Sequence, residues 1–565
     1  MNIARLLALL SALGLLLPAA RAFAEPPPTQ PPPVTADPPP PPPAPPAPPA
    51  PPPPPVAPPP PPPPLSAPEV PKKEAPSDNY YPSTRLAFTF GDDNVLVGAG
   101  ETRKSSPSAF FGQCNRTSLD RTVASDCYRQ NITNLILYKR LKLHANFQPE
   151  AALALGIDLQ NNMITDEGSY IRANWFFDET HRTYWALTLF PLDSDRLRLG
   201  YYYDVSWGGT DTFPKNFRKG LAPGLRFDMD LGYFSFFVGA KAALIRSPAE
   251  DVLDNKGGNT IKNVERTNYG VFAGVGAPFG QSGVRMELNG GFFQKGTNTR
   301  QNALGEPIYA GGFSGRVSWS RGIAIGRQTD IRIFQQDPVR NALFQKEIYQ
   351  TGLVSVALEA EATGLVQNLE DPDHTQSTKI EWAALGHFGL SMKVGFWRIF
   401  AHTIVRSLSA ITFDVPGFIP YQALPKDAKV SPEIMGSLGF DYNFKSIDLT
   451  LGFNYLILRP ATFIGTVPTG LNASITEQGL RKVVIRGSRS GDWDILPPGE
   501  NELPVHMLRL DLKWSFFESF GVIGQIGYTR DDNLASVKQD SFGHNIRVFD
   551  QPNGVNFNLI CQVKF

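Results

Sequence analysis

Apolar and polar residues alternate along much of the chain after residue 80, with the two-residue period of a β-strand. The last twelve residues show the pattern most clearly. One face of this stretch carries Val555, Phe557, Leu559, Cys561, Val563 and Phe565, and the other carries Gly554, Asn556, Asn558, Ile560, Gln562 and Lys564. Similar alternation at 196–207, 225–231, 447–455 and 507–516 predicts strands that each have one apolar face.

Two architectures produce this alternation. A soluble sandwich or propeller buries the apolar face, whereas a membrane barrel turns that face to lipid and its polar face to a lumen. The predicted strands run to about 10–14 residues, which is longer than the strands of most globular sheets and enough for a tilted membrane span. Aromatic residues fall near strand ends, where an interfacial girdle requires them: Trp175, Phe176, Phe177, Tyr201, Tyr202, Tyr203, Tyr233, Trp319, Trp397 and Trp514. We therefore expect an all-β fold, a transmembrane antiparallel β-barrel.

Residues 1–24 have the organisation of a secretory signal peptide. Arg5 precedes an apolar run, Leu6–Leu17, and Ala22-Phe23-Ala24 offers a small-x-small cleavage site. The run is about twelve residues long, whereas a helix that spans a bilayer needs about 20. An N-terminal membrane anchor is the alternative, and no Cys stands near the site to carry a lipid. No later stretch reaches about 18 apolar residues, so we expect no helical membrane span.

Residues 25–79 form a separate proline-rich segment. Between Pro26 and Pro71, 30 of 46 residues are proline. Such a segment packs no core, because proline donates no backbone hydrogen bond and large apolar side chains are scarce. We expect a disordered arm of polyproline II character, with a rise of about 3.1 Å per residue. This arm is either a spacer or a docking strip for a periplasmic export partner or the cell wall.

Apolar residues stand at alternate positions up to the end of the chain: Phe557, Leu559, Cys561, Val563 and Phe565. With this ending, residues 80–565 resemble a bacterial outer-membrane β-barrel protein. In that class the last strand commonly ends in an aromatic residue, usually Phe, and the barrel assembly machinery reads this signal. The resemblance implies insertion into the outer membrane of a Gram-negative bacterium, with outer-membrane lipid and the assembly machinery as partners and the N-terminal arm in the periplasm.

About eighteen strands are expected, with sixteen to twenty tolerable. Twenty candidate strands begin near 84, 132, 150, 168, 182, 195, 222, 234, 267, 282, 308, 326, 350, 379, 396, 431, 446, 503, 519 and 553. Long loops should be extracellular and short turns periplasmic, but the long connections 209–221 and 247–266 fall on the wrong side. If one candidate within 132–191 and one within 338–393 are false, the long connections move to the extracellular side and about eighteen strands remain. A barrel of this size encloses an aqueous channel unless it is plugged.

Charged residues at alternate positions should line the lumen. The predicted lining residues are Arg140, Lys142, Arg196, Arg198, Arg226, Asp228, Arg285, Glu287, Arg316, Asp330, Arg332, Arg509, Asp511 and Lys513, joined by His144, Asp204, Asp230 and Asp448. Residues two apart on a strand share a face, so opposite charges such as Arg226 and Asp228 are neighbours. The set is either a self-neutralising lattice that hydrates the wall or a weakly basic conduit for anionic or polyhydroxylated solutes.

The loops carry two further predictions. Cys114 and Cys127 lie in the first long loop of an exported protein, so we expect a disulfide between them. Two Cys alone are a poor metal site, and neither a metal nor a cofactor is predicted. Loop 460–502 is the longest and is either a lid or inward constriction, or a mobile surface loop.

Three functions are compatible with these patterns. The first is a channel across the outer membrane for hydrophilic solutes. A nutrient porin and a port for exported polysaccharide are equally compatible with the predicted lumen. The second is a structural or adhesion barrel that grips the cell wall through its Pro-rich arm. The third is an outer-membrane hydrolase, which we do not expect because the His residues are scattered and neither G-x-S-x-G nor H-E-x-x-H occurs. A formal net charge of zero gives no footprint for nucleic acid. The solute and the oligomeric state are left open.

Overall fold

The computed structural model describes most of the region after residue 82. The described residues are 83–92, 95–96, 132–158, 163–166, 169–178, 183–192, Leu197, Leu199, 223–253, 259–280, 282–297, 307–322, 351–371, 378–412, 426, 428–465, 481–485, 493–517 and 519–564. The predicted signal peptide 1–24, the Pro-rich segment 25–79, and the Cys114–Cys127 disulfide lie outside the described residues and stay predictions.

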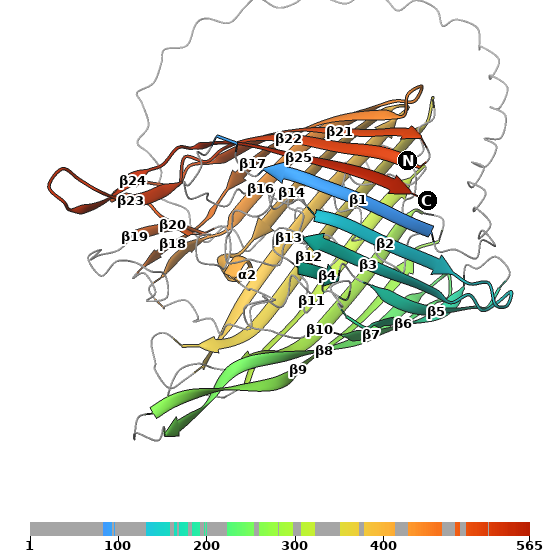
Figure 1. Ribbon diagram of the computed structural model, residues 1–565, viewed down its shortest axis with the longest axis horizontal. Coiled ribbons are helices and arrows are strands. Elements are labelled where there is room, and N and C mark those ends of the chain that lie inside the picture. The colour runs from blue at the N-terminus through green and yellow to red at the C-terminus, as the bar shows by residue number, and fades with distance from the viewer. Residues whose placement is uncertain are drawn as a thin grey trace, which may run out of the picture. The chain divides into compact units, whose positions relative to one another are not determined.

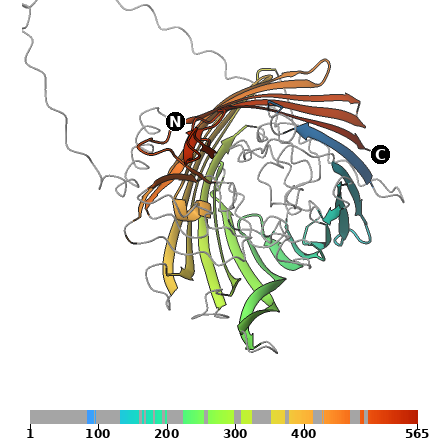
Figure 2. The ribbon, with the colours of Figure 1, turned by 60° about the vertical axis from the view of Figure 1, so that its left-hand side comes forward.

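One antiparallel sheet closes on itself as a barrel (Figures 1 and 2). Its nineteen strands occupy eighteen positions, because β4 (Met163–Asp166) and β5 (Tyr170–Phe176) pair with successive parts of β3. Around the ring, the other strands are β1 (Ser83–Asp92), β2 (Ile132–Arg140), β3 (Glu150–Asp158), β6 (Tyr184–Phe190), β7 (Gly224–Asp230), β8 (Ser235–Leu253), β9 (Asn259–Pro278), β10 (Val284–Thr297), β11 (Pro307–Arg321), β12 (Val354–Glu370), β13 (Thr378–Val394), β14 (Trp397–Arg406), β16 (Glu433–Phe444), β17 (Leu449–Arg459), β21 (Val505–Phe517), β22 (Phe520–Arg530) and β25 (Asn553–Lys564). The prediction of about eighteen strands is confirmed.

The ring closes between the first and the last strand. β25 pairs with β1 over the register Arg85↔Lys564 to Asp92↔Phe557, and its other edge pairs with β22. Apart from the short β4, which pairs only with β3, every strand of the ring has a hydrogen-bonded neighbour on both sides. Closure of this kind leaves no open sheet edge, whose backbone N–H and C=O groups would find no hydrogen-bond partners in lipid.

The burial pattern is inverted relative to a soluble sandwich. Along β16, Ile434, Leu438 and Phe440 are exposed, while Glu433 and Asp441 are buried. The same alternation recurs along β13, β14, β17, β21 and β22. Apolar side chains therefore cover the outer face and polar side chains the inner face, as the membrane-barrel alternative predicted. The described part of the chain contains no helix with the length and hydropathy of a membrane span.

The two ends of the barrel differ. At the end where β1 begins and β25 ends, here called the turn end, most connections are short, and β13 joins β14 through the two residues Gly395 and Phe396. Gly395 has a positive φ of 59°, which suits a two-residue hairpin. At the opposite end, here called the loop end, lie the described parts of the predicted outward loops 460–502 and 531–552. Short turns mark the periplasmic side and long loops the extracellular side.

The described residues of the predicted aromatic girdle lie at the turn end, whereas Tyr201, Tyr202 and Tyr203 lie outside the described residues. Trp175 and Trp185 stack across β5 and β6 with ring centroids 6.2 Å apart. Trp514 Nε1 donates a hydrogen bond to the carbonyl of Ile447, and Trp319 Nε1 donates to the carbonyl of Ser282, each at 3.1 Å. Both acceptors lie in turns, so each indole satisfies its polar edge at the rim of the barrel, as Trp does at a membrane interface.

The positions of both surplus strands were predicted wrongly, because the strands begun near 350 and 379, within 338–393, are also present as β12 and β13. The four strands begun near 132, 150, 168 and 182 are all present, so none within 132–191 is false. The surplus candidate is the one near 195, where Leu197 and Leu199 form bends inside the barrel. The 247–266 connection belongs largely to β8 and β9, and the candidate near 326 lies outside the described residues.

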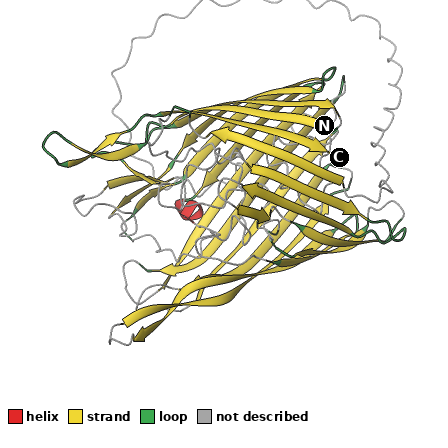
Figure 3. Cartoon of the chain, viewed as in Figure 1, coloured by secondary structure: helices red, strands yellow, loops and turns green. Residues whose placement is uncertain are grey.

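Loop 460–502 is partly folded (Figure 3). It contributes β18 (Ala461–Gly465), β19 (Arg481–Ile485) and β20 (Trp493–Ile495), which form a sheet with β15 (Lys429–Ser431). The helix α2 (Leu408–Thr412) packs on this sheet through a small core of Leu408, Ile411, Ala461, Phe463, Val483, Ile485 and Ile495. We call α2 and this four-stranded sheet the cap. A separate hairpin, β23 (Ala535–Gln539) and β24 (Asn545–Phe549), follows β22.

Candidate functional site: the inner wall of the barrel

The inner wall is the candidate site. Every second residue of a strand faces the lumen, and most of these inward residues are polar. Its charged residues form a series of ion pairs. On β7, the Arg226 guanidinium lies 2.8 Å from the Asp228 carboxylate and covers the Phe237 ring of β8 at 4.2 Å. Arg172 of β5 approaches the same Asp228 at 3.7 Å. One buried carboxylate is therefore shared by cations from two strands.

A second series of charges crosses three strands. Glu287 on β10 forms ion pairs with Arg285 at 3.2 Å and with Arg316 of β11 at 3.1 Å. Arg316 also approaches Glu359 of β12 at 3.9 Å. Glu287 is almost fully buried, so its two cations offset the penalty of holding a carboxylate in the wall.

Further pairs continue around the ring. Arg398 on β14 pairs with Asp441 on β16. Arg509 and Asp511 pair on β21 at 2.9 Å, and Gln525 of β22 donates a hydrogen bond of 2.6 Å to Asp511. The wall therefore carries charges of both signs in close pairs.

The structure places the predicted lining residues in three groups. Arg226, Asp228, Arg285, Glu287, Arg316, Arg509 and Asp511 lie on ring strands and form the ion pairs above. Arg140 ends β2 and pairs with Glu150 at 2.6 Å, whereas Lys142 and His144 lie exposed in the following turn, and Lys513 is exposed near the turn end of β21. Outside the described residues lie Arg196, Arg198, Asp204, Asp330 and Arg332. A role in solute passage remains a prediction for all of them.

Sequence analysis missed several inward residues. Glu150, Arg172, Lys241, Glu359, Arg398 and Asp441 all belong to the wall or its pairs. Each stands at an alternate position of a strand, so the two-residue period could have marked them. Most of their partners stand on neighbouring strands, and the register that joins them is not visible in the local sequence.

An apolar cluster lies on the inner wall and includes two residues of the β6–β7 connection. Leu197 and Leu199 are fully buried in one cluster with wall residues of eight strands, among them Phe272 and Leu365. Leu197 packs over Gly239, where the absence of a side chain leaves room. Leu197 and Leu199 therefore lie inside the barrel and occupy part of its cross-section.

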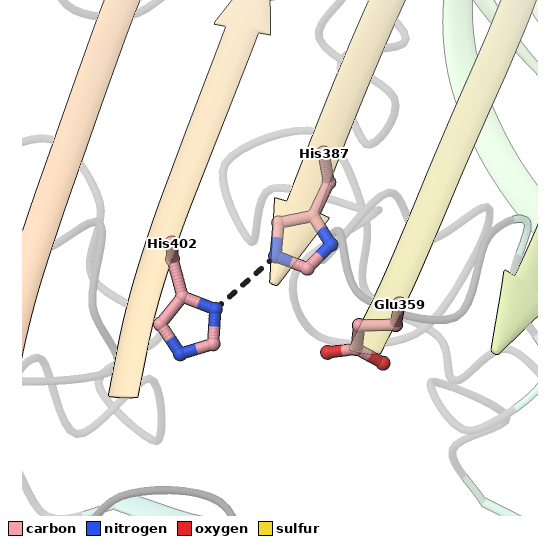
Figure 4. A group of neighbouring side chains, drawn as sticks. All are labelled: Glu359, His387 and His402. Atoms are coloured by element: carbon pink, nitrogen blue, oxygen red, sulfur yellow. Dashed lines mark hydrogen bonds between the residues drawn. The ribbon is translucent and has the colours of Figure 1, made fainter. Parts of the chain in front are cut away.

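A further group on the wall has ligand chemistry. Glu359 of β12, His387 of β13 and His402 of β14 each place one ligand atom within 4.8 Å of the others (Figure 4). His387 Nε2 and His402 Nδ1 are 3.3 Å apart and share a hydrogen bond. Sequence analysis predicted no metal site, because these residues are far apart in the chain and follow no spacing motif.

The last strand carries the predicted assembly signal on the outer face. Leu559 is exposed, Phe90 of β1 lies beside Phe557 with ring centroids 5.4 Å apart, and Cys561 is a free thiol opposite Phe88. Val563 pairs with Leu86 in the same register, and Phe565 lies outside the described residues. Recognition by the assembly machinery stays a prediction.

A closed antiparallel ring with an apolar exterior and a charged interior defines an outer-membrane β-barrel protein. No protein-family model matches the chain, and no curated protein matches its sequence. Among solved structures it is similar to Pseudomonas aeruginosa OpdQ, with 9% identity over 86% of this chain and 97% of that chain and a TM-score of 0.38. The P. aeruginosa OccK2 (OpdF) structure has 8% identity over 86% of this chain and 97% of that chain, with a TM-score of 0.39. The P. aeruginosa outer membrane protein OpdK has 9% identity over 86% of this chain and 98% of that chain, with a TM-score of 0.37. The class assignment rests on the ring and its two faces.

Proposed function

We propose that the protein is a channel that passes small hydrophilic solutes across the outer membrane. The supporting observation is a closed ring of eighteen positions whose inner wall carries paired charges, from Arg226 and Asp228 to Arg509 and Asp511. Barrels of about 16–18 strands are wide enough for an aqueous lumen. A wall of this polarity keeps the lumen hydrated. A channel needs a hydrated lumen, whereas a purely structural barrel does not.

The pairing of the charges bears on the class of solute. The acids of the wall have arginine neighbours, so a passing solute meets both signs at short intervals and the wall should select weakly by charge. Arginine donors bind hydroxyl and carboxylate oxygens, which favours polyhydroxylated or anionic solutes. The inward Leu197 and Leu199 favour small solutes. Among the described residues, nothing favours the export of a polysaccharide.

Conductance of the purified protein in planar bilayers tests this function. We expect discrete current steps and a reversal potential near zero in a salt gradient, with block by small sugars or sugar acids. A matched recording uses a variant without the cap residues 460–502. Absence of conductance from both proteins would contradict the channel and favour a structural or adhesion barrel.

The Pro-rich arm requires a separate test, because its role is still a prediction. Deletion of Pro26–Pro71 should leave conductance unchanged if the arm is a spacer or a docking strip outside the lumen. Crosslinking in intact cells then separates the two alternatives. Partners that disappear with the deletion indicate docking, and an unchanged crosslinking pattern indicates a spacer.

A further inference from the structure

Two imidazoles and one carboxylate converge on the inner wall, at the end of the series of ion pairs that runs from Glu287 through Arg316 to Glu359. Glu359, His387 and His402 come from the adjacent strands β12, β13 and β14, and Figure 4 shows the two rings directed toward each other with the carboxylate beside His387. His387 and His402 are 4% and 7% exposed, and the Glu359 side chain is 23% exposed. The group is therefore partly screened from water yet reachable from the lumen.

The register of the three strands explains the convergence. Glu359 pairs with Gly389, and Gly389 pairs with His402, so the three residues form one row across the sheet. His387 stands two residues before Gly389 and shares its inward face. A Cβ atom added at Gly389 would lie 3.0 Å from both Glu359 Cγ and His387 Cε1. The missing side chain lets the ligands meet above the backbone of β13.

The distances suit a metal ion. Zinc–nitrogen bonds of 2.0–2.1 Å in a tetrahedral site place two ligand nitrogens about 3.3–3.4 Å apart. His387 Nε2 and His402 Nδ1 are already 3.3 Å apart, and the carboxylate lies within 4.8 Å. A small side-chain rotation then gives three ligands and leaves one or more positions open toward the lumen. The geometry points to a site at Glu359, His387 and His402 for a divalent transition-metal ion of the zinc class.

The surrounding charges set the strength of the site. Arg316 lies 3.9 Å from Glu359, but its closer acid is Glu287 at 3.1 Å. A divalent ion would therefore be held by one carboxylate in the presence of a nearby cation. Imidazole and carboxylate ligands suit zinc, copper, nickel and ferrous iron, whereas calcium and magnesium prefer all-oxygen sites.

Cobalt binding to the full-length protein in detergent tests the proposal without any need for conductance. We expect one Co²⁺ per chain, with visible ligand-field bands, and displacement of the cobalt by Zn²⁺. His387→Gln with His402→Gln should weaken binding at least tenfold. His506→Gln removes a histidine from the outer face of β21 and should leave binding unchanged. Binding that survives the double replacement, or no saturable binding at all, would overturn the site.

A second variant separates a lost ligand from a damaged barrel. Gly389→Ala keeps all three ligands but places a methyl group between them, so affinity should fall at least tenfold. Gly386→Ala, on the outer face of the same strand with nothing within 4 Å of the added atom, should bind like the wild type. Circular dichroism confirms that each variant retains its strands. Equal affinity for the two alanine variants would contradict the placement of the three ligands around Gly389.

Discussion

The ammonium group of Lys241 on β8 donates a hydrogen bond to the backbone carbonyl of Leu197 in the β6–β7 connection. Lys241 is buried, and its Nζ atom also lies 4.9 Å from the centroid of the Phe272 ring. A buried cation thus joins the inner wall to a chain segment that enters the barrel. The contact identifies one side chain that holds Leu197 against the inner wall.

Replacing Lys241 with Met should loosen this segment. Met keeps the length and apolar contacts of the side chain but removes the donor, so the Leu197 carbonyl loses its partner. We expect larger single-channel conductance and more frequent current fluctuations. Lys393→Met, which removes a buried lysine from β13, is the matched control. Identical records from the wild type and Lys241→Met would show that the connection does not restrict the lumen.

The charge lattice should govern ion selectivity. Glu287→Gln removes the carboxylate that Arg285 and Arg316 share, so the wall gains net positive charge. We expect a reversal potential shifted toward anion selectivity in a potassium chloride gradient. Breaking a buried pair destabilises by about 3–5 kcal/mol, and a smaller loss is expected here because Arg285 is one-third exposed. Glu500→Gln, in an exposed turn, serves as the control, and an unshifted reversal potential would contradict the role of the lattice.

The sequence predicts the ring far better than its interior. Alternation and strand parity lead to eighteen positions, because both follow from the two-residue period. The same period misled at Leu197 and Leu199, since a segment docked by two alternate leucines has the pattern of a strand. The pairs Arg172–Asp228 and Arg316–Glu359, and the group at His387, depend on the register between strands. No local pattern contains that information.

Close packing on the inner wall is tested at Gly439. The Phe400 ring of β14 lies over this glycine of β16, and an added Cβ would also lie 2.8 Å from the carbonyl oxygen of Phe453. Gly439→Ala should destabilise the barrel by about 1–3 kcal/mol, since the ring must move and the backbone cannot. Urea unfolding in lipid vesicles measures the change. Gly386→Ala should unfold like the wild type, and an equal midpoint for the two variants would count against this packing.

The cap should loosen in acid. Glu502 accepts a hydrogen bond of 2.6 Å from Lys482 on β19 and lies 3.3 Å from Arg459. Partial burial opposes ionisation of Glu502, but the hydrogen bonds from Lys482 and Arg459 prevail and hold its pKa below the usual value. The stabilisation is therefore complete above the unfolded pKa of about 4.3 and is lost as the pH falls through the lowered folded value.

Hydrogen exchange of residues 481–485 measures this loss. The protection of these amides, corrected for the intrinsic exchange rate, should fall between about pH 5 and 3 in the wild type. Glu502→Gln should lower the protection at neutral pH and remove most of its pH dependence. Protection that stays constant to pH 3 in the wild type would mean that this ion pair does not hold the cap.

Assembly should depend on the end of the last strand. β25 is the strand that closes the ring between β22 and β1, and its outward residues Cys561 and Val563 pair with Phe88 and Leu86. Deletion of Phe565 should lower the folded fraction in the outer membrane several-fold, because it removes the aromatic end of this apolar row. Heat-modifiable migration of the barrel on gels measures that fraction. Phe542→Ala changes an exposed aromatic residue between β23 and β24 and should assemble normally. Normal insertion of the Phe565 deletion would show that assembly reads another part of the closing strand.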